Sequence, residues 1–240
     1  MHVLHREILD EIKEYSGKAT HHTFLENYLG NSHPRYPISA PAMRNIAKGF
    51  IKKNASLSGR GVEGVLDSLF KGESFTEKVI AGILLDYLNK EQRVIKLKSF
   101  DRWLGLLEGW AEIDALCTGK YMEKEIPLHL GEWTPFLRKL SKSKTIGKRR
   151  ASLVFLCSPV SHSADGKLAS IAFENIESLK HETDGLITKA ISWLLRSMIR
   201  HHRDAVEEYL SDNAETLPAI AVRETRIKLK TGKKTSPRRK

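Results

Sequence analysis

Residues 183–199, TDGLITKAISWLLRSMI, decide the fold of this chain. Apolar side chains recur here at intervals of three and four residues, which places them along one face of an α-helix. Thr183 and Asp184 stand directly before the first apolar residues, and both residue types accept hydrogen bonds from the exposed N–H groups of a helix N-terminus. The stretch therefore predicts an amphipathic helix that begins beside Asp184.

The same spacing recurs along most of the chain, between signals that start and stop helices. Further helix starts are predicted at Ser39 with Pro41, Ser74 with Glu77, Ser99 and Thr145. Helix ends or turns are predicted at Gly17, 30–37, 59–61, Gly72, Gly131, 158–166 and 217–218. No alternating run of β-branched and aromatic residues is bounded by hairpin turns, so the chain is expected to be all-α, with about a dozen helices.

Short connections between the predicted helices favour antiparallel helix pairs that stack side by side. The chain shows no strict sequence repeat, but its spacing is compatible with the pair length of roughly 40 residues in HEAT-type arrays. Such an α-α superhelix, or solenoid, has a concave face that can hold an extended ligand. We expect one domain of this kind over residues 1–230, followed by a basic, disordered tail over 231–240, TGKKTSPRRK.

The overall charge points to a polyanionic partner. The chain contains 40 Lys and Arg residues and 29 Asp and Glu residues, which gives a net charge of +11 and a pI near 9.6. Nucleic acid is the first candidate for such a surface. A membrane partner is not expected, because no apolar run approaches the roughly 20 residues of a spanning helix.

The cellular setting is predicted to be a reducing cytoplasm. The first 15 residues carry charges throughout and lack an apolar segment with a cleavage site, so no secretion signal is expected. Cys117 and Cys157 lack C-x-x-C spacing and are expected to be buried free thiols.

Basic residues gather in two places. Between residues 134 and 164 there are seven basic side chains and no acidic one: Arg138, Lys139, Lys142, Lys144, Lys148, Arg149 and Arg150. The helix start expected at Thr145 would add backbone N–H groups as phosphate ligands. A second group near the end comprises Arg223, Arg226, Lys228 and Lys230. Any one lysine here is most simply a solvated surface charge, but an acid-free patch is unusual, since most surfaces mix signs.

Trp110 and Asp114 form the most informative local pattern. The segment EGWAEIDALC places them four residues apart, hence on one face of a helix. A carboxylate beside an indole can stabilise a developing cation or position a water molecule for attack at an anomeric carbon. On spacing alone, a core tryptophan beside an aspartate that caps a helix or pairs with a neighbouring cation is the simpler interpretation.

Other kinds of chemistry lack support. The pairs His21–His22 and His201–His202 do not have the spacing or the Cys and Glu partners of a zinc site, so solvated or capping roles are expected and no metal is predicted. No phosphate-binding loop, dinucleotide fingerprint or serine-hydrolase elbow occurs, so no nucleotide or other cofactor is expected.

Five motifs, in the same order and at similar separations, resemble the bacterial AlkD-like family of DNA alkylation repair glycosylases. They are YLGNSHPRYPISAPAMR, GWAEIDALC, GKRRASLVFLCSP, DGLITKAISWLLR and AVRETRIKL, and together they extend over residues 28–230. The resemblance implies a superhelix of HEAT-like repeats with a concave basic face that holds alkylated double-stranded DNA. It also implies hydrolysis of the N-glycosidic bond of cationic purines such as N3-methyladenine and N7-methylguanine, without a base-flipping pocket. A monomer associated with the bacterial nucleoid is expected.

Carried over to this chain, the resemblance makes Asp114 the catalytic carboxylate. Trp110 and Trp193 become the aromatic pair that packs against the sugar and backbone of the lesion. Arg150 becomes the arginine that grips a nearby phosphate, and Tyr28 lies close to the DNA. The remaining expected DNA contacts are Arg149, Lys148, Arg196 and Arg223.

Three alternatives remain open at the level of sequence. Arg149 stands beside Arg150 in GKRRASL, so the phosphate contact could belong to either. Relatives of the family bind branched or damaged DNA without cleaving it, which makes a non-catalytic DNA-binding protein the main rival. A helical scaffold for proteins is the third possibility, and it predicts weak dependence of binding on salt.

Overall fold

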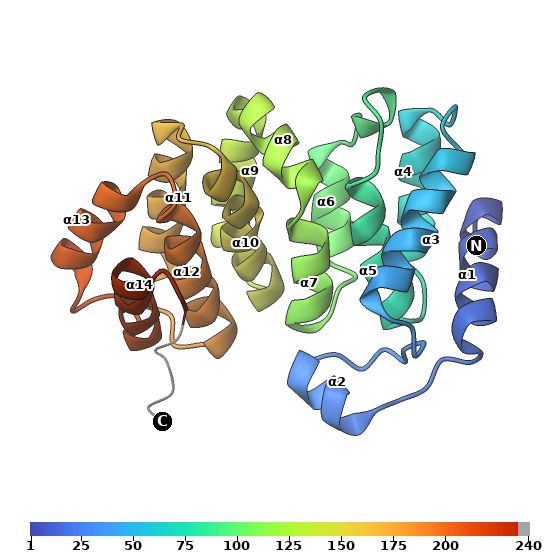
Figure 1. Ribbon diagram of the computed structural model, residues 1–240, viewed down its shortest axis with the longest axis horizontal. Helices are drawn as coiled ribbons and strands as arrows, with labels where there is room; N and C mark the ends of the chain where they lie inside the picture. Colours follow the sequence, from blue (N-terminus) through green and yellow to red (C-terminus); the bar gives the residue numbers. More distant parts are fainter. Residues whose placement is uncertain (235–240) are drawn as a thin grey trace. The chain divides into compact units, whose positions relative to one another are not determined.

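The computed structural model describes residues 1–234, and every named element in that part of the chain is a helix. It contains fourteen α-helices, one short 3-10 helix and an isolated bridge between Thr20 and Arg35, which confirms the all-α prediction. Two compact units are present, the first Met1–Tyr121 and the second beginning at Met122 (Figure 1). Among these described helices, none is both long and apolar enough to cross a membrane.

The first unit is a two-layer stack of helices. Its elements are α1 (Val3–Ser16), α2 (Thr23–Leu29), α3 (Ala40–Lys53), α4 (Gly59–Phe70), α5 (Phe75–Leu85), the 3-10 helix η1 (Glu91–Arg93), α6 (Leu97–Leu104) and α7 (Gly109–Cys117). One layer is formed by α1, α3, α5 and α7, each of which packs against the next, while α4 packs against α5 and α6. The short helix α2 lies outside this stack and contacts α7 (Figure 1).

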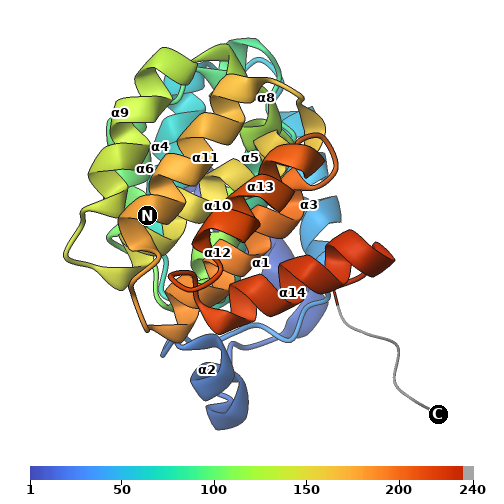
Figure 2. The ribbon, with the colours of Figure 1, turned by 90° about the vertical axis from the view of Figure 1, so that its left-hand side faces the viewer.

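The second unit repeats the two-layer arrangement. Its elements are α8 (Lys120–Leu128), which contains the boundary between the units, α9 (Leu130–Ser141), α10 (Ile146–His162), α11 (Gly166–Leu179), α12 (Gly185–Met198), α13 (Arg203–Asn213) and α14 (Ala219–Thr231). Helix α12 packs between α10 and α14, and α9 and α11 pack together against α10. Figure 2 views this unit from its end, with α13 and α14 toward the viewer. Residues 235–240 of the predicted tail lie outside the described residues.

Aromatic side chains fill the interior of each unit. In the first, Trp103 is fully buried, stacks on Phe70 at 4.8 Å and meets Phe100 edge-on at 5.2 Å. In the second, Trp133 is 3% exposed and meets Phe155 edge-on at 5.2 Å. These two tryptophans therefore stabilise the cores and are not site residues. The two cysteines are buried and free, as predicted.

Most predicted helix starts are confirmed. Ser39 caps α3 by accepting a hydrogen bond from Ala42 N–H at 3.4 Å, and Asp184 caps α12 by accepting from Leu186 N–H at 2.7 Å. Helix α5 begins with a complete capping box: Ser74 accepts from the N–H of Glu77, whose carboxylate accepts from the N–H of Ser74. Thr145 precedes α10 as expected, although its side chain makes no capping hydrogen bond.

Three local predictions were wrong, and a fourth was wrong in part: α10 continues to His162, so the turn expected at 158–166 begins only at Ser163. Ser99 does not start a helix, because α6 already begins at Leu97 and the buried hydroxyl of Ser99 donates to Glu63. The turn expected at 59–61 is the first turn of α4, and the turn expected at Gly131 lies inside α9.

Glu77 is expected to be a major contributor to stability. Its carboxylate is buried. It contacts His5 Nε2 at 2.8 Å and accepts a hydrogen bond from the N–H of Ser74 at 2.9 Å. Burial alone raises the pKa of Glu77, but the hydrogen bonds from His5 and Ser74 outweigh it and hold the pKa below its ordinary value of 4.5. Glu77→Ala should lower the free energy of unfolding by about 3 kcal/mol, because it leaves a buried partner uncompensated.

The pH dependence gives this prediction a sign. A depressed carboxyl pKa stabilises the folded state above its unfolded pKa near 4.5 and loses that effect as the pH falls through the folded-state pKa. Denaturant unfolding of wild type and Glu77→Gln should therefore differ most near pH 7 and converge below pH 4.5. Glu73→Gln, which changes an exposed glutamate close to Glu77 in sequence, serves as the control for removal of one negative charge. A difference that does not change with pH would show that ionisation of Glu77 is not the source.

Candidate functional site

Helix α7 carries Trp110 and Asp114 one turn apart, as the sequence predicts. Both side chains are partly exposed, whereas Ile113, Leu116 and Cys117 of the same helix are at most 2% exposed. The helix thus buries one side in the first unit and presents the indole and the carboxylate on the other.

Tyr28 is brought directly against Trp110. The indole Nε1–H donates to the backbone carbonyl of Tyr28 at 2.9 Å, and the two rings meet edge to face with their centroids 5.6 Å apart. The phenol ring is 64% exposed. Two residues that the resemblance assigned separately to the DNA are therefore neighbours, from α2 and α7.

The contact depends on a glycine that sequence reasoning missed. Gly109, the first residue of α7, has φ +63°, and a Cβ there would lie 1.9 Å from the carbonyl oxygen of Leu29 and 2.7 Å from that of Gly30. Only glycine allows both this left-handed conformation and this close approach of two backbones. The end of α2 can therefore rest directly on the start of α7.

Two glutamates at the start of α7 hold the segment after α2 in place. Glu108 accepts from the N–H and the hydroxyl of Ser32, both at 2.8 Å. Glu112 accepts from His33 Nδ1 at 2.8 Å, from the Asn31 amide at 3.4 Å and from the N–H of Glu108 at 2.8 Å. We call these five residues the clamp. The sequence contained a signal for it, because Glu108 and Glu112 lie four residues apart on either side of Trp110.

The two clamp glutamates have opposite pKa shifts. Burial raises the pKa of Glu112, whose side chain is fully buried, against the opposing effect of its hydrogen bonds. Hydrogen bonds from the backbone and then the hydroxyl of Ser32 lower the pKa of Glu108, against the effect of partial burial. The outer part of the clamp is thus a solvated pair of hydrogen bonds to a carboxylate, and the inner part is a buried hydrogen-bond contact.

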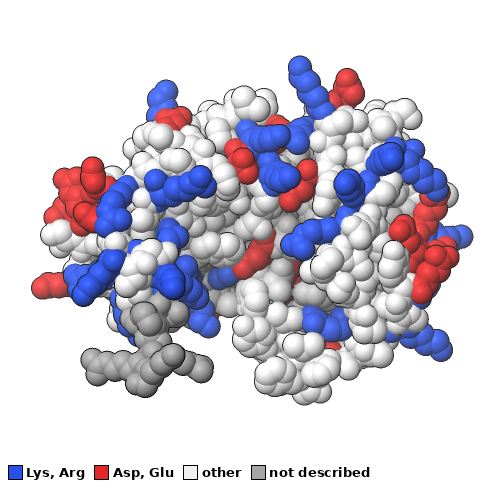
Figure 3. Space-filling view, in the orientation of Figure 1, with Lys and Arg blue, Asp and Glu red and all other residues white. Residues whose placement is uncertain are grey.

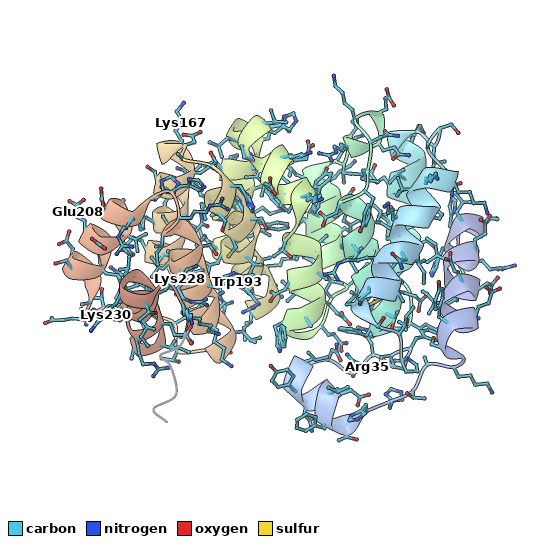
Figure 4. All side chains as sticks on the ribbon, in the orientation of Figure 1. Arg35, Lys167, Trp193, Glu208, Lys228 and Lys230 are labelled. Atoms are coloured by element: carbon cyan, nitrogen blue, oxygen red, sulfur yellow. The ribbon has the colours of Figure 1, made fainter. Side chains whose placement is uncertain are left out.

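Trp193 lies on α12 in the second unit and is partly exposed (Figure 4). Arg196 follows it by three residues, lies 3.4 Å from Glu224 of α14 and donates to Ser192 at 3.3 Å. Burial lowers the pKa of Arg196, and Glu224 opposes that shift. The arginine expected at the DNA is therefore tied to α14 by an ion pair within its own unit.

The neighbouring arginines of α10 have different surroundings. Arg150 is 5% exposed and donates to the carbonyl of Leu186 in α12 at 2.6 Å. Arg149 is partly exposed, pairs with Glu182 at 3.0 Å and donates to the carbonyl of Ser143 at 2.9 Å. Lys148, one residue earlier, is partly buried. Arg150 thus contacts the helix that carries Trp193, and Arg149 pairs with Glu182.

The second basic group lies on α14, the last helix. Arg223, Arg226 and Lys230 are exposed, and Figure 3 shows Lys and Arg gathered over this helix. Lys228 instead turns inward: its ammonium donates to the carbonyl of Arg196 at 2.9 Å, and burial lowers its pKa. Three of the four cations therefore form an outward stripe, with spacings of three and four residues.

Comparisons with known proteins agree with this arrangement. The sequence profile of a family described as "DNA alkylation repair enzyme" matches residues 8–229. A solved structure described as "Predicted DNA alkylation repair enzyme from Enterococcus faecalis" aligns with a TM-score of 0.67 and 18% identity, over 85% of this chain and 92% of that chain. At this identity the likeness shows a shared fold. No match was found among curated proteins.

Proposed function

Because the chain belongs to the family of DNA alkylation repair enzymes, we propose that it is a DNA glycosylase. Its substrates would be cationic alkylated purines in duplex DNA, such as N3-methyladenine and N7-methylguanine. The observation that carries the proposal is the placement of Trp110 and Asp114 together on one partly exposed side of α7, with Tyr28 against the indole.

The proposed reaction needs few catalytic groups. An alkylated purine already carries a positive charge, so the C1′–N bond can break with its electron pair going to the base, which leaves neutral. Positive charge then develops on the deoxyribose, where the Asp114 carboxylate would stabilise it. A water oxygen forms the new bond to C1′ and releases a proton. The ring of Trp110 would pack against the sugar and exclude solvent.

Residues of the second unit are assigned to binding the DNA. We propose that Trp193 packs on the sugar-phosphate backbone and that Arg150 contacts a phosphate. The choice of Arg150 over its neighbour follows the resemblance, and its contact with Leu186 directs it toward the helix that carries Trp193. The other proposed phosphate contacts are Lys148, Arg149, Arg196 and the exposed Arg223. Such contacts position a duplex without reading its sequence.

The test of the proposal is release of base from duplex DNA that contains N7-methylguanine. The protein is first shown to bind the duplex, and free base is then measured by chromatography against a no-enzyme control. We expect release well above spontaneous depurination. Binding without any release would reject the glycosylase proposal.

The exposed cations of α14 also favour a second candidate, a protein that binds DNA without cleaving it. Both DNA-binding functions predict that log affinity falls linearly with log salt, by about 0.9 for each phosphate neutralised. Arg223→Ala should reduce this slope by about 0.9 if its guanidinium contacts a phosphate. Fluorescence anisotropy over a salt series measures the slope, and Lys167→Ala, an exposed lysine on α11, is the control (Figure 4). An affinity that does not respond to salt would instead support a protein scaffold.

A further inference from the structure

Three aromatic side chains form a continuous surface on the first unit; two of them are exposed and the third, Trp110, is partly exposed. Phe24 and Tyr28 lie one turn apart on α2 with nearly parallel rings, at an interplanar angle of 4° and a centroid distance of 6.5 Å. Tyr28 in turn meets Trp110 of α7 edge to face. Phe24 is 72% and Tyr28 64% exposed. We call these three residues the aromatic strip.

Hydrogen bonds and a close backbone contact hold the aromatic strip in place. The indole N–H of Trp110 is bound to the carbonyl of Tyr28, and Gly109 lets the end of α2 rest on α7. The clamp fixes the chain that follows α2. A surface that is ordered before its ligand arrives loses little conformational entropy on binding.

The surroundings of the aromatic strip fit a flat, uncharged ring better than a phosphate. Helix α2, TFLENYL, contains no Lys or Arg, and its one acid, Glu26, is engaged by His21 at 2.8 Å. In Figure 3 the lobe that α2 forms is mostly white, with few charged side chains. Exposed apolar patches of this kind mark binding sites.

The small area of the aromatic strip and the net charge of the chain favour a nucleobase over a protein as the ligand. A fully buried aromatic side chain covers about 150–250 Å², so three partly exposed rings fall short of the roughly 800 Å² per partner of a stable protein interface. The net charge of +11 favours a polyanionic ligand. Every kind of base can stack on an aromatic side chain, because each has a flat π-face.

We propose that Phe24 and Tyr28 of the aromatic strip stack on an unpaired base of bound DNA, beside the sugar that Trp110 contacts, and that Phe24 is the outer contact. The inference rests on the proposed function only in taking DNA as the ligand and Trp110 as a sugar contact. It adds a binding residue that lies one turn beyond Tyr28, and it implies a preference for DNA in which a base has left the helical stack.

Two duplexes of identical sequence test the proposal, one fully paired and one with a single bulged 2-aminopurine. Wild type should bind the bulged duplex roughly 5- to 20-fold more tightly and quench the fluorescence of the base, since stacking on one aromatic side chain has an effect of this size. Phe24→Ala should lose both the preference and part of the quenching, while its affinity for the paired duplex stays the same. Phe24→Trp should keep both.

A matched control shows whether the preference belongs to the aromatic strip. Tyr15→Ala removes an exposed aromatic ring of α1, outside the strip, and should leave the preference unchanged. If Phe24→Ala binds the bulged duplex as wild type does, or loses affinity equally for both duplexes, the proposal is wrong. Because the assay involves no base release, failure of the glycosylase proposal would not affect the result, and base release by a protein without the bulge preference would overturn the stacking proposal alone.

Discussion

Replacing Asp114 by Asn is expected to slow release of N7-methylguanine at least about 100-fold, the effect of removing one preorganised charge that stabilises a transition state. Asparagine has nearly the same size and shape, so helix α7 and its contacts should persist. It lacks the negative charge that would stabilise the developing cation on the sugar. Single-turnover kinetics, with protein in excess over DNA, measure the chemical step directly.

The same variant distinguishes catalysis from binding. DNA affinity should remain nearly unchanged, because the phosphate contacts are assigned to other side chains. Asp10→Asn, an exposed aspartate of α1, is the matched control and should release base at the wild-type rate. If Asp114→Asn is as active as wild type, Asp114 is not the catalytic carboxylate. If it releases no base and also fails to bind, its role is in DNA binding or in the fold.

Gly109→Ala is expected to destabilise the first unit by at least about 2 kcal/mol, since a non-glycine residue would be strained at this positive φ. The added Cβ would also lie 1.9 Å from the Leu29 carbonyl oxygen, so the end of α2 must move away from α7. The hydrogen bond between Trp110 and Tyr28 should weaken as a result. Thermal unfolding and tryptophan fluorescence measure the two effects.

Gly49→Ala provides a control within the same unit. Gly49 lies inside α3, and a Cβ there would meet nothing within 4 Å, so alanine should stabilise the protein by about 0.5–1 kcal/mol. Equal stability of the two variants would show that α2 does not need its close contact with α7. Loss of stability in Gly109→Ala alone would confirm that the contact between α2 and α7 depends on this glycine.

The sequence predicted the helical class and many helix starts because those features are local. The capping residues at Ser39, Ser74 and Asp184 act on N–H groups two or three residues away, so the pattern is visible in the chain itself. The failures at Ser99 and Gly59 have tertiary causes. The hydroxyl of Ser99 donates a hydrogen bond to Glu63 of another helix. Position 59 favours glycine because a Cβ there would lie 3.1 Å from the carbonyl oxygen of Glu91.

The candidate site was predictable only in part for the same reason. The spacing of Trp110 and Asp114 placed them on one helix face, and the resemblance supplied their roles. The contact of Tyr28 with Trp110 joins residues 82 positions apart, and no periodicity reveals it. The acids that engage Arg149 and Arg196 are likewise distant in sequence: Glu182 is 33 positions from Arg149. Packing of separate helices creates these pairs, so they appear only in the folded protein.

The hydrogen bond from Trp110 to the Tyr28 carbonyl has a consequence for how damage could be told from intact DNA. An indole has a single donor, and here the protein itself uses it. The ring can then offer a ligand only its faces and its carbon edges, which are the same to adenine and guanine. A glycosylase built around this tryptophan would distinguish purines by how easily each one leaves its sugar, so that the lability of the lesion would select the substrate.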